Sequence, residues 1–228
     1  MSSLLAHAIA AAPPASFPRD GLRGRPLIWS EDATGLGLWS TEWSRDLRLE
    51  RPDAFEHHRL VERICAAQPC LPVRFGTAFP SADAARASLE ERSATLHAAL
   101  VRVAGKSEVA LTLLWREPTE PPATPASAAG PGRAYLEARR ADFTAEEDRR
   151  GRAEVMVERL IAELAIERSL VWHETCTSAS VAVSLAVLVP TERALEWKAR
   201  LARAASPLES VTQVVNGPWP PYTFARAG

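Results

Sequence analysis

The sequence predicts an α+β protein made of two small α/β-type domains, the C-terminal one ferredoxin-like. Three observations lead to this fold class. Short apolar segments of strand character alternate with longer segments of helical periodicity along the chain. A proline-rich stretch at 117–132 interrupts this alternation. The second half follows the order strand, helix, strand, strand, helix, strand, which is the β-α-β-β-α-β order of ferredoxin-like domains.

The first domain, residues 1–106, begins with short apolar segments that clusters of Pro and Gly interrupt, which is typical of strands joined by turns. A helix then begins near Asp53, where Asp53 and Glu56 resemble an acidic capping box, and Pro69 ends it. Ser81 caps a second helix, and Gly105 stops it. The predicted strands of this domain are 4–11, 25–30, 35–43 and 70–75.

The second domain, residues 107–228, opens with an alternating strand and continues after the proline-rich loop with a long charged helix. In that helix Thr144 and Glu147 predict a second capping box, and Gly151 predicts a break or kink. The predicted strands are 108–115, 170–175, 180–189 and 210–216, and the predicted helices are 133–168 and 191–205. A tail reading GPWPPY follows, and the fold by itself indicates no function.

Composition describes an ordinary globular protein. Of its 228 residues, 46% are hydrophobic and 24% are charged, so disorder is excluded as a general state. The formal net charge is −1, whereas proteins that coat nucleic acid or anionic membranes carry a basic excess. The arginine-rich stretch 133–152 is interspersed with acids and therefore indicates a solvated helix face. We expect neither nucleic acid nor a membrane as partner.

The cysteines and the N-terminus favour a cytoplasmic protein. Cys65, Cys70 and Cys176 lack the spacing of a disulfide framework or a zinc site, which suggests a reducing compartment. The apolar stretch 4–12 is too short to span a bilayer, and no basic segment precedes it as in a signal peptide. It is interpreted as the first strand.

The most unusual segment is 217–224, which reads GPWPPYTF. Its prolines fix the backbone and place large aromatic residues on a stiff extended scaffold. One interpretation is a rigid aromatic anchor for a partner protein, since Trp and Tyr are frequent interface hot spots. The other, which we favour for Trp219, is a C-terminal clasp that packs back onto the core.

A second motif, 71–77, reads LPVRFGT and follows the helical segment 58–63, HRLVER. Arg74 is either a cation presented at a strand end or the solvent-facing residue of an alternating strand, and both interpretations stay open. Gly76 indicates a backbone geometry that a side chain would block.

Both motifs, in this order, resemble the GvpL/GvpF family of gas vesicle proteins. Family members have a similar histidine-bearing helix before an LPVRFGT-like strand, and they end in a similar Gly-Pro-Trp-Pro-Pro-Tyr run. Weaker similarities are Glu108-Val109, the start of the long helix at 135–139, and 187–190, so the resemblance covers about residues 53–225. The short first strand, with His7 where the family has an aromatic-rich strand, departs from the family pattern.

The resemblance implies an accessory protein of gas vesicle formation, without enzymatic activity or cofactor and located in the cytoplasm at gas vesicles. Its partners would be the hydrophobic, GvpA-type shell protein or other accessory proteins. Covering an aggregation-prone shell protein before assembly is physically sensible. The residues expected to define this role are Leu71, Pro72, Arg74, Phe75, Gly76, Gly217, Pro218, Trp219, Pro220, Pro221 and Tyr222.

The alternative is a small-molecule-binding module or enzyme on the ferredoxin-like domain, with His58 or His173 in its site. His57 and His58 are adjacent on a helix and point in different directions, which suits neither a metal pair nor a relay. His173 and Cys176 lie close in sequence, but no neighbouring residue is of a kind that would activate the thiol. A deep polar pocket around the histidines would favour this alternative, and an apolar groove would favour a binding protein.

Overall fold

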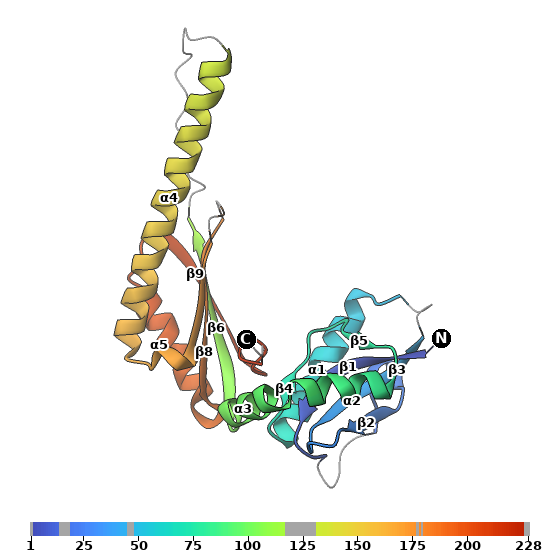
Figure 1. Cartoon of the computed structure of the whole chain (residues 1–228). Helices are drawn as coiled ribbons and strands as arrows, with labels where there is room; N and C mark the ends of the chain where they lie inside the picture. The colour runs from blue at the N-terminus through green and yellow to red at the C-terminus, as the bar shows by residue number, and fades with distance from the viewer. Residues whose placement is uncertain are drawn as a thin grey trace. The chain divides into compact units, whose positions relative to one another are not determined.

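The computed structural model describes residues 2–13, 19–44, 48–116, 131–176, 178 and 180–225 (Figure 1). The chain divides into two compact units. Unit 1 comprises Met1–Glu108 together with Trp219–Gly228, and unit 2 comprises Val109–Pro218. Unit 1 is therefore discontinuous in sequence, and the last segment of the chain groups with the first.

Unit 1 contains a sheet in the order β2-β3-β1-β4, with β5 also paired to β1. The strand pairs are antiparallel. In β1 the pairing register shifts between Ala6 and Ala8. The strands are β1 (Ser2–Ala10), β2 (Leu27–Glu31), β3 (Gly37–Ser44), β4 (Leu71–Pro72) and β5 (Ala78–Phe79).

Helices pack on both faces of this sheet because neighbouring residues of a strand point to opposite faces. Helix α1 (Arg51–Ala67) buries Leu60 and Ile64 against Ala8 and Trp39. Ile9 and Leu38 point the other way, toward the helices α2 (Ala82–Glu91) and α3 (Ser93–Val103). The sheet is thus the middle layer of unit 1.

Three local predictions for unit 1 were wrong. The capping box of α1 joins Glu50 and Asp53, not Asp53 and Glu56, because the helix begins at Arg51 and Asp53 is its third residue. The predicted strand 70–75 is reduced to Leu71–Pro72, because after Val73 the chain leaves β1 and enters the turn closed by Arg74 and Thr77. The single helix expected after Ser81 is two helices, since the chain leaves helical geometry at Arg92.

The structure also corrects the interpretation of the cysteines. Cys65 near the end of α1 and Cys70 just before β4 form a disulfide, with 5.3 Å between their Cα atoms. The turn at Gln68 and Pro69 brings the two residues within the separation that a disulfide requires. Cys176 is free. The cysteine pattern therefore does not by itself indicate a reducing compartment.

Unit 2 has the ferredoxin-like order of elements, and its sheet has the strand order β7-β8-β6-β9. Strands β7 and β8 form an antiparallel hairpin in which Val171 is paired with Val187. Its elements are β6 (Lys106–Trp115), α4 (Pro131–Leu164), β7 (Val171–Thr175), β8 (Val181–Pro190), α5 (Ala194–Ala205) and β9 (Val211–Trp219). Mixed helices and antiparallel strands confirm the α+β class.

Both long helices of unit 2 lie on one face of its sheet (Figure 1). Leu160 and Leu164 of α4 and Leu201 of α5 pack against Leu111 and Val187 of the strands in an apolar core. The N-terminal half of α4 extends beyond the sheet, and Tyr135, Leu136 and Phe143 there are exposed. The apolar alternation predicted for β6 is confirmed, since Val109, Leu111 and Leu113 are fully buried.

Two expectations for unit 2 were wrong. Helix α4 continues through Gly151 without a break, and Thr144 donates to the Arg140 carbonyl inside the helix, 3.0 Å away, so it does not cap. Strand β9 continues to Trp219, so the first three residues of the GPWPPY motif belong to a strand. Of the proline-rich loop predicted at 117–132, residues 117–130 lie outside the described residues, and Pro131 and Gly132 belong to the start of α4 instead. Among the residues that are described, no helix has the length and apolarity needed to cross a membrane.

Candidate partner-binding groove

The LPVRFGT segment forms an interrupted edge of the sheet in unit 1. Its start pairs with β1 through Leu71 and Pro72, and the Val73 amide donates to the His7 carbonyl over 2.8 Å. At its end the Thr77 carbonyl accepts from the Ala6 amide of β1 over 2.9 Å. Between the ends, the Thr77 amide donates to the Arg74 carbonyl over 3.1 Å and closes a turn. Gly76 adopts φ +86° in this turn, a conformation that favours glycine. Arg74 is therefore presented on a turn at a strand end, and it is exposed.

The tail after β9 is fastened to unit 1 by polar contacts. Both carboxylate oxygens of the buried Glu108 accept hydrogen bonds from Thr223, one from its amide over 2.8 Å and one from its hydroxyl over 2.7 Å. The Arg102 guanidinium donates to the Phe224 carbonyl. Phe224 itself is buried, so an apolar contact and charge-assisted hydrogen bonds hold the same short segment.

Aromatic residues of the tail pack on helix α1. The His58 ring stacks on the Tyr222 ring with 6.1 Å between centroids, and it meets the Trp219 ring edge-on at 6.5 Å. Burial and the negative charge of Glu62 raise the pKa of the Tyr222 phenol, which stays neutral at physiological pH. Trp219 is 37% exposed, so it rests on the surface of unit 1, whereas Phe224 enters the core.

These two motifs meet in a groove of about 800 Å³, which we call the motif groove. Its walls come from the LPVRFGT segment, from α2 and α3, and from the tail. The lining is mostly apolar, with Leu71, Phe75, Leu89, Leu96 and Tyr222 among its members. A groove of this size and character is typical of binding sites.

The charges at the motif groove are all of one sign. Arg74 and Arg92 line it, and no acidic side chain does so among the described residues. Within the described part of the chain, neither guanidinium has a hydrogen-bond or ion-pair partner. The groove therefore presents an apolar surface together with two available cations.

Two buried histidines lie behind the LPVRFGT segment. The rings of His7 and His57 are 5.1 Å apart, and His57 is 5.3 Å from the ring of Phe75. The Nε2 atom of His7 lies 2.7 Å from the Thr41 hydroxyl, and that of His57 lies 3.4 Å from the Ala6 carbonyl. Burial lowers the pKa of His7 to about 3 and that of His57 to about 4. Both rings are therefore neutral near pH 7.

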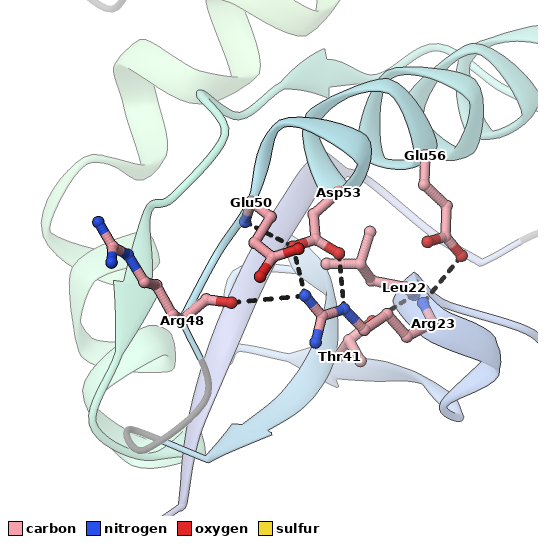
Figure 2. A network of polar contacts seen from close by, with 7 residues as sticks. All are labelled: Leu22, Arg23, Thr41, Arg48, Glu50, Asp53 and Glu56. Atoms are coloured by element: carbon pink, nitrogen blue, oxygen red, sulfur yellow. Dashed lines mark hydrogen bonds and ion pairs between the residues drawn. The ribbon is translucent and has the colours of Figure 1, made fainter.

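A polar network fixes the start of α1 in unit 1. Figure 2 shows the Arg23 guanidinium directed at both carboxylate oxygens of Asp53, at 2.6 and 2.7 Å. Asp53 also accepts from the Glu50 amide over 2.7 Å, and Glu56 accepts from the Arg23 amide over 2.8 Å. The hydrogen bonds from Arg23 hold the pKa of the Asp53 carboxyl below its usual range. These contacts are structural, because they connect the helix to the loop before β2.

The structure brings many of the predicted site residues together. Leu71, Pro72, Arg74, Phe75 and Tyr222 line the motif groove. The others lie in different places: Gly76 is in the turn, Pro220 and Pro221 are buried between Trp219 and Tyr222, and Gly217 and Pro218 are in the part of β9 that belongs to unit 2. There the Lys198 ammonium donates to the Gly217 carbonyl over 2.8 Å.

The histidines of the alternative interpretation line no such groove. His173 is exposed on β7, and burial together with the charge of Glu174 raises the pKa of the Cys176 thiol, which disfavours the reactive thiolate. His58 is engaged by Tyr222 and by Glu62, whose carboxylate lies 3.4 Å from its Nε2. In the part of the chain that the structure describes, no three His, Cys, Asp or Glu side chains cluster as metal ligands would.

Sequence reasoning missed three residues of this region. Glu108 was noted only as part of a weaker family similarity and not as the anchor of the tail, for which the available signal was a carboxylate at the start of an otherwise apolar strand. Arg92 stands at the junction of α2 and α3, and it was overlooked because one continuous helix was expected there. His7 was noted only as a departure from an aromatic strand, and no local signal predicted its burial beside His57.

Fold and groove together define an α+β protein with two antiparallel-strand units and an apolar surface groove. The family model for gas vesicle synthesis proteins GvpL/GvpF matches residues 5–226. The chain therefore belongs to the GvpL/GvpF family and has a role in gas vesicle formation. No curated protein sequence matches the chain significantly.

Solved structures of similar fold are gas vesicle proteins too. The crystal structure of GvpF from Anabaena sp. PCC7120 is similar with a TM-score of 0.71 and 18% identity, covering 100% of both chains. The crystal structure of GvpF from Microcystis aeruginosa is similar with a TM-score of 0.71 and 15% identity, covering 98% of this chain and 99% of that one. At such low identity these structures show that the fold is shared.

Proposed function

We propose that this protein is a non-enzymatic accessory factor that binds the GvpA-type gas vesicle shell protein, or another assembly factor, through the motif groove. By covering apolar surface of the bound protein before assembly, it limits aggregation. The binding takes place in the cytoplasm, at growing gas vesicles, and needs no cofactor.

The observation that carries this proposal is the convergence of the two family-like motifs on one apolar groove. Leu71 and Phe75 come from the first motif and Tyr222 from the second, and all three line it. Large aromatic residues beside an open apolar surface are typical of protein-binding sites. The half-exposed Trp219 contacts the same His58 ring as Tyr222 but does not line the groove.

The same observation disfavours a small-molecule enzyme. An enzyme site would be expected to gather polar and titratable groups with perturbed pKa values in its pocket. The two histidines with strongly lowered pKa values, His7 and His57, are buried behind the groove wall and have no access to a ligand. The groove itself has an apolar lining with two exposed arginines.

Binding can be measured by pull-down and by light scattering. The purified protein is mixed with freshly expressed shell protein, and aggregation of the shell protein is followed with and without it. We expect saturable binding and slower aggregation. Phe75→Ala combined with Tyr222→Ala removes two aromatic groove walls and should weaken binding by at least about tenfold.

The matched control is Phe55→Ala, which removes an aromatic side chain of α1 that is 61% exposed and lies outside the groove. It should bind as the unsubstituted protein does. Circular dichroism checks that each variant is folded. Unchanged binding by a folded Phe75→Ala, Tyr222→Ala variant would refute the groove as the binding surface, and lack of binding to any gas vesicle protein would refute the proposed function.

A further inference from the structure

We infer that the motif groove selects an acidic amphipathic peptide segment, whose apolar side chains enter the groove while its carboxylates pair with Arg74 and Arg92. This inference rests on the proposed function for the identity of the partner as a protein. It adds the chemistry of the segment that is recognised, and it names two residues that determine specificity.

The first argument is the charge of the groove. Its only charged lining residues among those described are Arg74, on the turn after β4, and Arg92, between α2 and α3. The chain as a whole is nearly neutral, with 27 basic and 28 acidic side chains. The excess of positive charge in the described lining is therefore a property of the groove and not of the whole chain. A surface with a single sign of charge attracts a partner of the opposite sign.

The second argument is that these arginines have no structural task within the described residues. Other arginines of unit 1 do: Arg23 binds Asp53, Arg63 donates to the Asp20 carbonyl over 3.2 Å, and Arg102 holds the tail. Arg74 and Arg92 make no such side-chain contact in the described part of the chain, and both are exposed. Their planar guanidinium groups are suited to bidentate pairing with carboxylates.

The third argument is the apolar part of the lining. Val73, Phe75 and Phe79 are half-buried and supply the accessible apolar surface beside the arginines, and behind them lie nearly fully buried leucines of β4, α2 and α3, namely Leu71, Leu89 and Leu96. A purely acidic segment would leave this surface wet, and a purely apolar one would cover the guanidinium groups without pairing them, which is costly. A segment that alternates apolar and acidic side chains covers the apolar lining and also pairs the guanidinium groups.

The test uses two short peptides, both fluorescein-labelled and capped at each end, so that no terminal carboxylate interferes. One is rich in leucine and valine and carries two glutamates, and the other has glutamine at the same positions. Affinity for the full-length protein is measured by fluorescence polarisation. We expect the glutamate peptide to bind at least about tenfold more tightly. The preference should fall when salt is raised from about 0.05 to about 0.5 M.

The decisive variant carries Arg74→Gln and Arg92→Gln together. This double variant should bind both peptides with equal affinity, and its affinity for the glutamine peptide should equal that of the unsubstituted protein. Arg59→Gln is the matched control, because Arg59 is an exposed arginine of unit 1 outside the groove. This control should keep the full preference. All three residues are exposed, so the variants should stay folded, which thermal unfolding checks.

Equal affinity of the unsubstituted protein for the two peptides, or binding to neither, overturns the inference. A preference that survives in the double variant overturns it as well. The proposed function fails separately, when the protein binds no gas vesicle protein although it still prefers the glutamate peptide. Shell protein that binds equally to the double variant and to the unsubstituted protein leaves the function standing and refutes the role of the arginines.

Discussion

Unit 1 and unit 2 differ in what they bury. Unit 2 is held together by an apolar core in which Leu, Val, Ile, Met and Ala from two helices and four strands pack together. In unit 1, by contrast, polar and charged side chains are part of the interior. Every buried polar or charged residue among those described lies there, namely Ser3, His7, Ser30, Asp32, Ser40, Thr41, Asp53, His57 and Glu108.

This difference indicates where the specific geometry of the molecule is determined. Apolar burial is not directional, so many combinations of similar volume fill a core equally well. A buried polar group needs a particular partner at a particular distance. Unit 1 uses such partners around the two motifs, and the motif groove is formed by elements that they hold in place.

The largest expected difference between the two units is the loss of stability in acid, which should arise from the buried histidines of unit 1. His7 and His57 have pKa values of about 3 and about 4 in the folded protein, against 6.5 in an unperturbed histidine. At pH values between the folded and the unperturbed pKa, the unfolded chain binds more protons than the folded chain does. The free energy of unfolding therefore falls as pH drops below about 6.5. At pH 5 each histidine should reduce it by about 2 kcal/mol relative to pH 7.5. Urea titrations at the two pH values measure the difference.

His7→Gln should remove about half of this pH dependence, whatever it does to stability at pH 7.5. His173→Gln is the control, because His173 is exposed on β7 of unit 2 and should leave the pH dependence unchanged. If His7→Gln loses as much stability at pH 5 as the unsubstituted chain, the buried pair is not the acid-sensitive element.

Truncation in the core of unit 2 should give the next largest effect. Leu160 of α4 is fully buried, and Leu160→Ala leaves a cavity that costs about 3 kcal/mol. Urea unfolding at pH 7.5 measures this loss, which should be the same at pH 5. Val155→Ala on the same helix removes a side chain that is 70% exposed and should change little. Equal effects of the two substitutions would contradict the packing of α4.

Removing one polar clasp of unit 1 should have a smaller effect. Thr223→Val keeps the shape of the side chain and deletes the hydroxyl that donates to Glu108, which should cost about 1–2 kcal/mol. Hydrogen exchange should become faster in the tail. The control is Thr212→Val, at an exposed position of β9. Unchanged exchange in the tail would mean that the hydroxyl contact with Glu108 is not needed to hold it.

A pair of glycine substitutions should act in opposite directions and by the smallest amounts. Gly76→Ala forces a side chain into φ +86° and should destabilise unit 1 by about 1 kcal/mol. Gly151→Ala lies within α4, where an added Cβ has open space, and should stabilise unit 2 by about 0.5–1 kcal/mol. Thermal unfolding gives both signs, and a stabilising Gly76→Ala would contradict the turn geometry.

The same contrast explains what the sequence could predict. The order of elements in unit 2 and the buried face of β6 follow from local periodicity, because apolar packing leaves a regular pattern at Val109, Leu111 and Leu113. In unit 1, the strand expected at 70–75 ended early and the capping box was misplaced by three residues. There the backbone follows hydrogen bonds to distant partners, which leave no periodic signal.

For the candidate site, motif residues were predictable and their neighbours were not. Leu71, Arg74, Phe75 and Tyr222 belong to unusual local sequences, and the structure places them in one groove. The contact of Thr223 with Glu108 spans 115 residues, so no local pattern reveals it. Arg92 resembles any charged residue on a helix surface until the break between α2 and α3 is known.

The return of the chain to unit 1 after unit 2 has a consequence for biosynthesis. A ribosome translates residues 109–218, the whole of unit 2, before it reaches the segment from Trp219 onward. Because Tyr222 and Ala225 line the motif groove, the groove lacks part of its wall until this segment has left the exit tunnel. A nascent chain therefore gains a complete groove only after synthesis of both units, so premature termination within unit 2 yields a protein without one.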